Sequence, residues 1–247
     1  MKYRLIALTA LLLFACQAHA ELIVIGDVDA PNTSDRPQNY ALLENVRNGG
    51  TNIVWLTGGY PVNERYIDVR ARWTTAGATI TDDLTTTVGT SLAGRDLVVI
   101  SQLWCNDSQF DAGAISAIAS FIGGGGEALY IAQVCSTDQL NSYNAFLTAI
   151  GSSMQFLANS GNSSGVEVID TNTPYGQGVS EFELNGWTAL SGGIPVVTLN
   201  GETGVAYGTG SAAPSATVAV PTMTAYGIIL AILALFLVAS RRLRKYS

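Results

Sequence analysis

Apolar and polar residues alternate along most of the chain in two kinds of segment. Four short apolar runs rich in β-branched residues are typical of buried strands, and they lie at 22–26, 52–56, 96–101 and 128–132. Polar breaks and then apolar residues at helical spacing follow, as in 110–126 and 136–151. Strands that alternate with helices favour βαβ units. The pattern therefore predicts a doubly wound α/β fold, with a mainly parallel sheet covered by helices on both faces.

The segments around these runs fit the same arrangement. Helices are expected at 40–46 and 63–76, each ended by glycine, with a short strand at 78–81. After residue 150 the character changes, and short strands with turns between them are expected at 166–169, 180–184, 196–199 and 205–207. We therefore expect a β-rich completion of the sheet towards the C-terminus, partly antiparallel at its edge.

The first 20 residues have the three parts of a secretory signal peptide. Lys2 and Arg4 precede an apolar run, and the sequence AHA at 18–20 supplies a small-x-small cleavage site. We therefore expect cleavage after Ala20. The sequence LFAC is also close to a lipobox, so a lipoprotein signal acylated at Cys16 is an open alternative.

The other end of the chain resembles a membrane anchor in its composition. An uncharged, mostly apolar stretch at 222–240 is long enough to cross a bilayer core of ~30 Å as a helix. Four basic residues follow it and would stay on the cytoplasmic side: Arg241, Arg242, Arg244 and Lys245. The expected parts are thus a signal peptide (1–20), an α/β ectodomain (21–207), a flexible linker (208–219) and a membrane segment with its flanks (220–247).

The charge of the ectodomain is strongly one-sided. It holds all 19 acidic residues of the chain against six arginines, and it has no lysine and no histidine. Such a surface repels nucleic acid and anionic lipid, so neither is expected as a partner.

Two cysteines remain once the signal peptide is removed, Cys105 and Cys135. An even pair in an exported domain favours a disulfide over a metal or redox site. Both follow consecutive predicted strands, and neighbouring strands lie ~4.8 Å apart, within the range of about 4.4–6.8 Å that a disulfide needs between Cα atoms. We therefore predict that Cys105 and Cys135 are bonded, which would stabilise the fold by roughly 3–4 kcal/mol.

Few residues carry candidate chemistry. Asp27 and Asp29 follow the first strand and, with Asn32 and Asp35, could offer oxygen ligands to Ca²⁺ or Mg²⁺. Their spacing matches no known metal loop, so turn and capping roles are the preferred interpretation, and no metal or cofactor is predicted. The four glycines at 123–126 come between a helix and a strand, where they predict a helix C-cap and turn rather than a phosphate loop.

The ectodomain resembles the class I glutamine-amidotransferase-like fold, a flavodoxin-like sheet, across residues 21–207. The similarity lies in LAGRDLVVISQ, AISAIASFIGGGGEALYIA and NAFLTAIGSSMQF. The resemblance implies that Cys135 occupies the place of the family's nucleophile. The family's Gly-x-Cys-x-Gly elbow is missing, however, and the one histidine, His19, leaves with the signal peptide. The domain is thus similar to the exported, non-catalytic relatives, and no catalytic residue is predicted.

The tail resembles an IPTL-CTERM sorting signal. The motif residues are Val220, Pro221, Thr222, Met223 and Gly227, followed by the apolar span and the basic cluster. The resemblance implies an exosortase-like membrane protease as a partner, in a Gram-negative envelope.

These observations predict an exported, membrane-tethered or surface-sorted α/β domain without catalysis. Its role would be binding or structural in the cell envelope or extracellular matrix, with an envelope glycan or protein as the ligand. The alternative is a surface hydrolase that acts on glycans or peptides through carboxylates, for which Asp27 and Asp29 are the candidates.

Overall fold

The computed structural model describes residues 21–102, 110–161 and 167–209. The signal peptide, Cys105, the linker beyond 209, the sorting motif, the apolar span and the basic cluster lie outside these residues. Within them, no helix has both the length and the apolar character needed to cross a bilayer.

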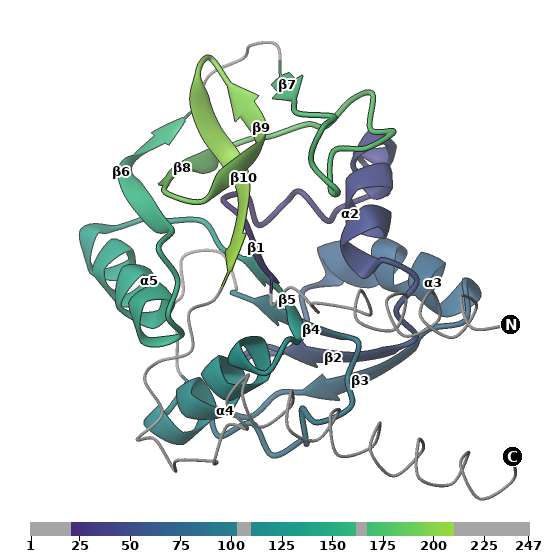
Figure 1. The fold of residues 1–247 in the computed structure, drawn as a ribbon, viewed down its shortest axis with the longest axis vertical. Helices are drawn as coiled ribbons and strands as arrows, with labels where there is room; N and C mark the ends of the chain where they lie inside the picture. The colour runs from purple at the N-terminus through teal and green to yellow at the C-terminus, as the bar shows by residue number, and fades with distance from the viewer. Residues whose placement is uncertain (1–20, 103–109, 162–166, 210–247) are drawn as a thin grey trace, which may run out of the picture. The chain divides into compact units, whose positions relative to one another are not determined.

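Five parallel strands form the first half of the sheet (Figure 1), in the spatial order β3-β2-β4-β5-β1. They are β1 (Glu21–Ile25), β2 (Asn52–Leu56), β3 (Thr79–Asp83), β4 (Leu97–Ser101) and β5 (Glu127–Ile131). The prediction of parallel strands at 22–26, 52–56, 96–101 and 128–132 is therefore confirmed, with Leu97 opposite Glu127 in the register of β4 and β5.

The C-terminal half completes the sheet with antiparallel strands. These are β6 (Gln155–Gly161), β7 (Glu167–Ile169), β8 (Trp187–Ser191), β9 (Ile194–Leu199) and β10 (Glu202–Thr209). Strand β10 pairs with β1, and β8 and β6 continue the sheet beyond it, while β9 and β7 branch from β10. The expectation that short, partly antiparallel strands complete the sheet towards the C-terminus is therefore confirmed.

One predicted strand is wrong. Residues 180–184 form no strand, and the segment runs as irregular chain towards β8. Its backbone bonds to a side chain instead of a neighbouring strand, because the Glu183 N–H donates to Asn39 Oδ1 and the Glu183 carbonyl accepts from Asn39 Nδ2. The sequence analysis also missed two strands, β6 and β8, and β8 begins three residues after this segment.

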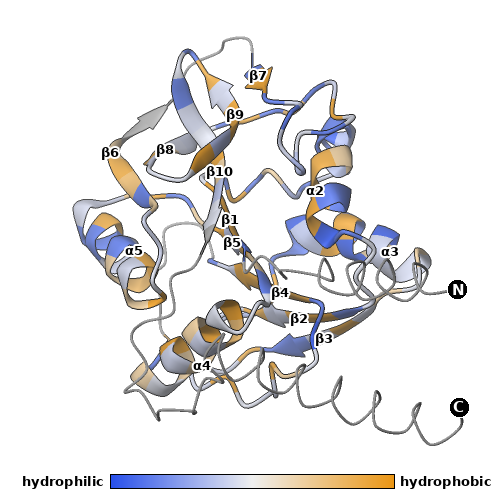
Figure 2. Cartoon of the chain, in the orientation of Figure 1, coloured by the Kyte–Doolittle hydropathy of each residue, from blue (hydrophilic) through white to orange (hydrophobic). Residues whose placement is uncertain are grey.

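Four α-helices cover the two faces of the parallel half (Figure 1): α2 (Tyr40–Arg47) and α3 (Ile67–Thr75) on one face, α4 (Ala112–Gly123) and α5 (Thr137–Ala149) on the other. Short 3-10 turns, η1 (Pro37–Asn39) and η2 (Glu64–Tyr66), lead into α2 and α3. Alternate residues of the strands pack into two hydrophobic cores, one on each face of the sheet. Ile23 and Ile53 face α2 and α3, while Leu22 and Val54 face α4 and α5. Hydrophobic residues accordingly concentrate on the central strands (Figure 2).

The ends of the helices follow local sequence signals. Asp111 caps α4 by accepting from the Ala114 N–H at 2.7 Å, and Ser136 caps α5 by accepting from the Gln139 N–H at 3.2 Å. Past the end of α4, the Gly126 N–H donates back to the Phe121 carbonyl at 3.0 Å. The predicted C-cap at 123–126 is therefore confirmed.

The connections leave the carboxyl ends of the parallel strands in opposite directions. Strand β2 leads to α3 on one face, whereas its neighbour β4 leads towards α4 on the other. Strands β1 and β5 diverge in the same way, towards α2 and α5. Open α/β sheets place ligands where neighbouring connections diverge, so a functional site is expected at this carboxyl edge.

Candidate functional site

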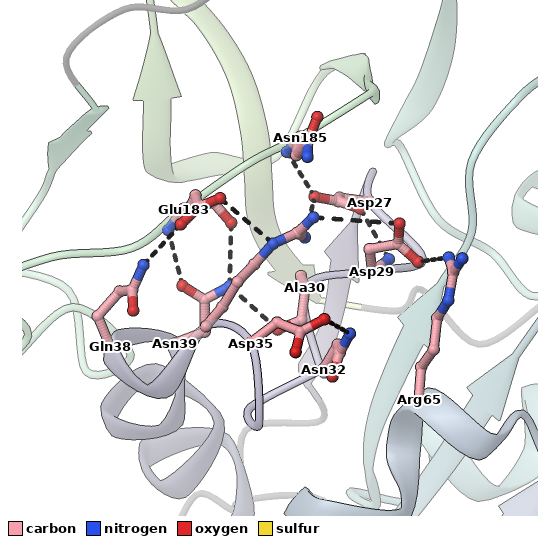
Figure 3. Close-up of polar contacts among 11 residues, drawn as sticks. Asp27, Asp29, Ala30, Asn32, Asp35, Gln38, Asn39, Arg65, Glu183 and Asn185 are labelled. Carbon is pink, nitrogen blue, oxygen red and sulfur yellow. Dashed lines mark hydrogen bonds and ion pairs between the residues drawn. The ribbon is translucent and has the colours of Figure 1, made fainter.

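A network of charged and amide side chains lies at the carboxyl end of β1 (Figure 3). We call it the Asp27 network, and its members are Asp27, Asp29, Arg36, Asn39, Arg65, Glu183 and Asn185. It joins the loop after β1 to the turn η2, which precedes α3, and to the segment before β8. These pieces are far apart in sequence, so the network is a product of the fold.

Gly26 explains why Asp27, at the centre of the network, is buried. An added Cβ at this position would lie 2.0 Å from the Thr188 carbonyl oxygen, which is closer than atoms can approach. The Gly26 N–H donates to the Gly204 carbonyl at 2.9 Å, and the Gly26 carbonyl accepts from the Thr188 N–H at 2.7 Å. Only glycine allows the chain to pass this close to β8, and that approach places Asp27 in the interior.

The Asp27 carboxylate has no free oxygen. Its Oδ1 accepts from the Asp29 N–H at 2.7 Å, and its Oδ2 accepts from the Asn185 N–H at 2.8 Å and from Arg36 Nη1 at 3.1 Å. The residue is 0% exposed. Burial raises the pKa of Asp27 to about 6, although the backbone donor of Asn185 and the charge of Arg36 act in the opposite direction.

Arg36 and Asn39 extend the network to the distant segment. Arg36 Nε lies 3.4 Å from Glu183 Oε1, and the Arg36 side chain is only 8% exposed. Asn39 Nδ2 donates to the Ala30 carbonyl at 3.0 Å and to the Glu183 carbonyl at 2.9 Å. The loop after β1 is thereby fixed against the residues that precede β8.

The outer part of the network is more open. Asp29 pairs with Arg65, whose side chain is 41% exposed, and Asp29 Oδ2 lies 4.0 Å from Arg36 Nη2. The other two weak metal candidates contact each other, since Asn32 Nδ2 donates to Asp35 Oδ2 at 2.8 Å. Among the described residues, no group of three His, Cys, Asp or Glu side chains could hold a metal ion. Arginines occupy the positions beside Asp27 and Asp29 where a cation would bind.

In the described residues, six side chains have buried polar atoms without a hydrogen-bond partner, and two of them belong to the connections that follow β2 and β4. The Tyr66 hydroxyl is one, and its pKa is raised by burial and by the charges of Asp29 and Asp27. The amide of Gln102, the residue that follows β4, is the other, and neither Oε1 nor Nε2 has a partner. The sequence analysis did not select either as a site residue, because a buried amide looks like any other Gln in sequence.

Cys135 follows β5 at the carboxyl edge, and its N–H donates to Gln139 Oε1 at 2.7 Å. The residue is disulfide-bonded, with its partner outside the described residues. The pairing with Cys105 therefore stays a prediction. A disulfide leaves no thiolate for nucleophilic attack.

A second acidic cluster lies at the amino end of β1. Tyr175 donates its hydroxyl proton to Glu21 and lies 3.2 Å from Glu127 Oε1. Burial raises the pKa of Glu127 to about 7, with the charge of Glu21 acting in the same direction and the Tyr175 hydrogen bond opposing it. These residues line a cavity of about 660 Å³ together with Asn45 and others.

No protein-family model matches the chain, and a search of curated proteins finds no similar sequence. The amidotransferase-like and IPTL-CTERM resemblances therefore rest on the residues alone.

Proposed function

We propose that the chain is an exported, membrane-tethered α/β domain that binds a ligand of the cell envelope without converting it. The observation that carries this proposal is that Asp27 is 0% exposed and that both of its carboxylate oxygens accept hydrogen bonds from the protein. A carboxylate that is bonded in this way fixes the loop after β1 and is not accessible to a substrate. The signal peptide, the apolar span and the basic cluster in the sequence support export and tethering.

The hydrolase alternative has one observation in its favour. A carboxyl with a pKa of about 6 suits a general acid, and glycosidases raise the pKa of one carboxyl in this way. A general acid must also come within about 2.6–3.2 Å of the substrate atom that it protonates. Asp27 meets Arg36 and two backbone N–H groups at those distances, and Asp29 faces Arg65. The contacts therefore favour a binding domain with a rigid carboxyl edge.

The doubly wound, amidotransferase-like assignment belongs to the same proposal. Counted from β2, the parallel strands follow the order 2-1-3-4, as in flavodoxin-like sheets. The fifth place is taken by β1, the first strand of the chain, instead of a strand from the C-terminal half. The strand order supports a relationship of fold and carries no information on activity.

A binding and turnover assay tests the function. A protein from Glu21 to Ala213 contains every residue whose contacts are described above. It should bind isolated envelope polysaccharide or peptidoglycan saturably, and the bound material should be recovered with its chain length unchanged. Shortened material, with shortening lost in the Asp29→Asn variant, would establish the hydrolase instead.

Processing at both ends tests the localisation. Protein isolated from its native host should begin at Glu21 and end upstream of the apolar span, because the proposed exosortase-like protease cuts near the Val220–Met223 motif. Intact-mass measurement reads both ends at once. A species from Glu21 to Ser247 would show the tail to be an anchor only, and a lipid mass on Cys16 would establish the lipoprotein alternative.

A further inference from the structure

A cavity of about 770 Å³ lies at the amino ends of β4 and β5, at the opposite edge of the sheet from the Asp27 network. Its walls come from the segment 88–95, which leads into β4, and from the end of α4 with the turn at 124–126. Val88 has a φ of 50°, which a β-branched residue rarely adopts. Strained backbone is concentrated at functional sites, so the cavity is a candidate binding site.

Arg95 lines this cavity and differs from the other arginines of the domain. The arginines that form ion pairs with carboxylates are Arg36, Arg47, Arg65, Arg70 and Arg72. Arg95 forms no ion pair with any described residue, although acidic residues greatly outnumber arginines in the chain. The adjacent carboxylate of Asp96 bonds elsewhere, because its Oδ2 accepts from the N–H groups of Thr51 and Asn52. The charge of Arg95 is therefore left for a ligand.

Uncharged groups hold the Arg95 guanidinium in place. Its Nε donates to the Ser91 carbonyl at 3.1 Å, and its Nη1 donates to Asn52 Oδ1 and lies 3.4 Å from Thr81 Oγ1. Its Nη2 makes no hydrogen bond within the described part of the chain, and it is not buried. An arginine that is already oriented loses less conformational freedom when it binds, so Nη2 is a prepared donor.

The surroundings favour a ligand with a single negative charge. Guanidinium groups bind carboxylates and phosphates through charge-assisted hydrogen bonds. The C-terminal end of α4 lies at this cavity, and the negative end of a helix dipole disfavours additional negative charge. Salt screens the remaining acidic surface beyond about 8 Å at physiological ionic strength, so one carboxylate in contact with Arg95 is tolerated.

The other walls of the cavity fit a sugar ring. Phe121 supplies an apolar wall, and its ring packs so closely on Gly126 that an added Cβ there would lie 2.4 Å from Phe121 Cζ. The hydroxyl-bearing residues Ser91 and Ser120 line the same space. A sugar presents an apolar C–H face together with hydroxyls that donate and accept. A uronic acid adds the carboxylate that Arg95 requires.

We infer that the cavity lined by Arg95, Ser120 and Phe121 binds an acidic sugar, whose carboxylate accepts from Arg95 Nη2. The inference rests on the proposed binding function and names the ligand class. A neutral sugar leaves the arginine unpaired, so the site distinguishes uronic acids from the corresponding neutral sugars.

Saturation-transfer NMR and calorimetry on the full chain test the site, in a detergent without sugar groups because of the apolar span at 222–240. The probes are glucuronate and galacturonate, with glucose, galactose, glucose 6-phosphate and a glutamate-containing tripeptide as comparisons. At least one uronate should bind, and its neutral counterpart should bind about ten-fold more weakly or worse. Tighter binding of the phosphate or of the peptide would overturn the ligand class.

Two sets of variants locate the site. Arg95→Met should weaken uronate binding by about ten-fold or more, whereas Arg72→Met, at an exposed ion pair, should leave it unchanged. Ala117, an exposed residue of α4, lines the cavity without contributing a polar side chain. Ala117→Glu should weaken uronate binding at least about three-fold more than the isosteric Ala117→Gln, because only the first adds a repelling charge. This second pair keeps the test decisive if Arg95→Met fails to fold.

Unchanged uronate binding in folded Arg95→Met, or equal binding in the two Ala117 variants, would overturn the site. If neither uronate binds but envelope polysaccharide or peptidoglycan still binds saturably, the inference fails and the proposed binding function stands. If no envelope material binds either, both fail.

Discussion

Strand β1 carries a carboxylate cluster at each end, and the two clusters are balanced in different ways. At the carboxyl end, arginines lie beside both Asp27 and Asp29. At the amino end, Glu21 and Glu127 share the hydroxyl of Tyr175, and no described contact brings a cation to them. Burial raises the carboxyl pKa at both ends, to about 6 for Asp27 and about 7 for Glu127.

This difference implies that the carboxylates at the two ends of β1 affect the stability of the fold in opposite directions. The ion pair of Asp27 with Arg36 and the hydrogen bond from the Asn185 N–H connect the loop after β1 to the segment before β8, so removal of one partner is expected to destabilise the carboxyl edge. At the amino end, no described cation compensates the charges of Glu21 and Glu127, so removal of one carboxylate should increase the stability of the fold. The two clusters should therefore respond to neutralisation with opposite signs.

The largest effect is expected for Arg36→Met. The substitution keeps much of the side-chain volume but leaves the buried Asp27 carboxylate without its cation, which typically costs about 3–5 kcal/mol. The loss should be greater at pH 7.5 than at pH 5, because at the lower pH Asp27 can take up a proton instead. Urea unfolding at both pH values measures it.

Arg72→Met is the matched control, since Arg72 pairs with Asp68 on an exposed helix face at 3.1 Å. Exposed pairs contribute about 0–1 kcal/mol. Equal losses in the two variants, or no pH dependence for Arg36→Met, would contradict a structural role for the Asp27 network.

Glu127→Gln should have the opposite sign. The folded-state pKa of Glu127 lies above its ordinary 4.5, so the folded protein holds this proton more tightly than the unfolded chain. Stability should therefore fall as pH rises from about 4.5 through 7. The variant should be more stable than the parent by about 1–3 kcal/mol at pH 8 and should show a flatter stability profile between pH 5 and 8. An unchanged profile would show that Glu127 titrates normally.

The smallest effect is expected for Arg65→Met. Its partner Asp29 is partly solvated, and the Arg65 side chain is 41% exposed. Such a pair contributes about 0–1 kcal/mol and is screened by salt. Unfolding in 50 mM and 500 mM salt should show a small difference that disappears at the higher concentration. A loss of unfolding free energy as large as that of Arg36→Met would contradict this, and would show that the exposed pair stabilises the fold as much as the buried pair does.

The sequence predicted the parallel half of the fold because its signals are local. Apolar runs such as 52–56 and 97–101 are buried on both sides, and their periodicity is visible without any partner. Strand β8 depends on pairing with β10 and β6, and its five residues carry little pattern of their own. The segment at 180–184 has the composition of a strand, but Asn39 takes up its hydrogen bonds.

Of the Asp27 network, only Asp27 and Asp29 were candidates from the sequence, because they follow a predicted strand. The short separation in sequence between Asp27 and Arg36 could have suggested an ion pair. The contacts to Asn185 and Glu183 could not have been found, because these residues lie more than 140 positions away in the chain. The unpaired state of Gln102 depends on what surrounds it, and it is visible only once the fold is known.

Burial and the contact with Arg36 together set the pKa of the Asp27 carboxyl, whereas burial and the charge of Glu21 raise the pKa of Glu127 and only the Tyr175 hydrogen bond opposes them. Carboxyl-carbon NMR titration of the labelled protein from Glu21 to Ala213, assigned with Asp27→Asn and Glu127→Gln, tests it directly. Titration midpoints are expected near pH 6 for Asp27 and near pH 7 for Glu127, and the Asp27 midpoint should move upward in Arg36→Met. Midpoints near the ordinary values of 3.8 and 4.5, unaffected by Arg36→Met, would contradict it.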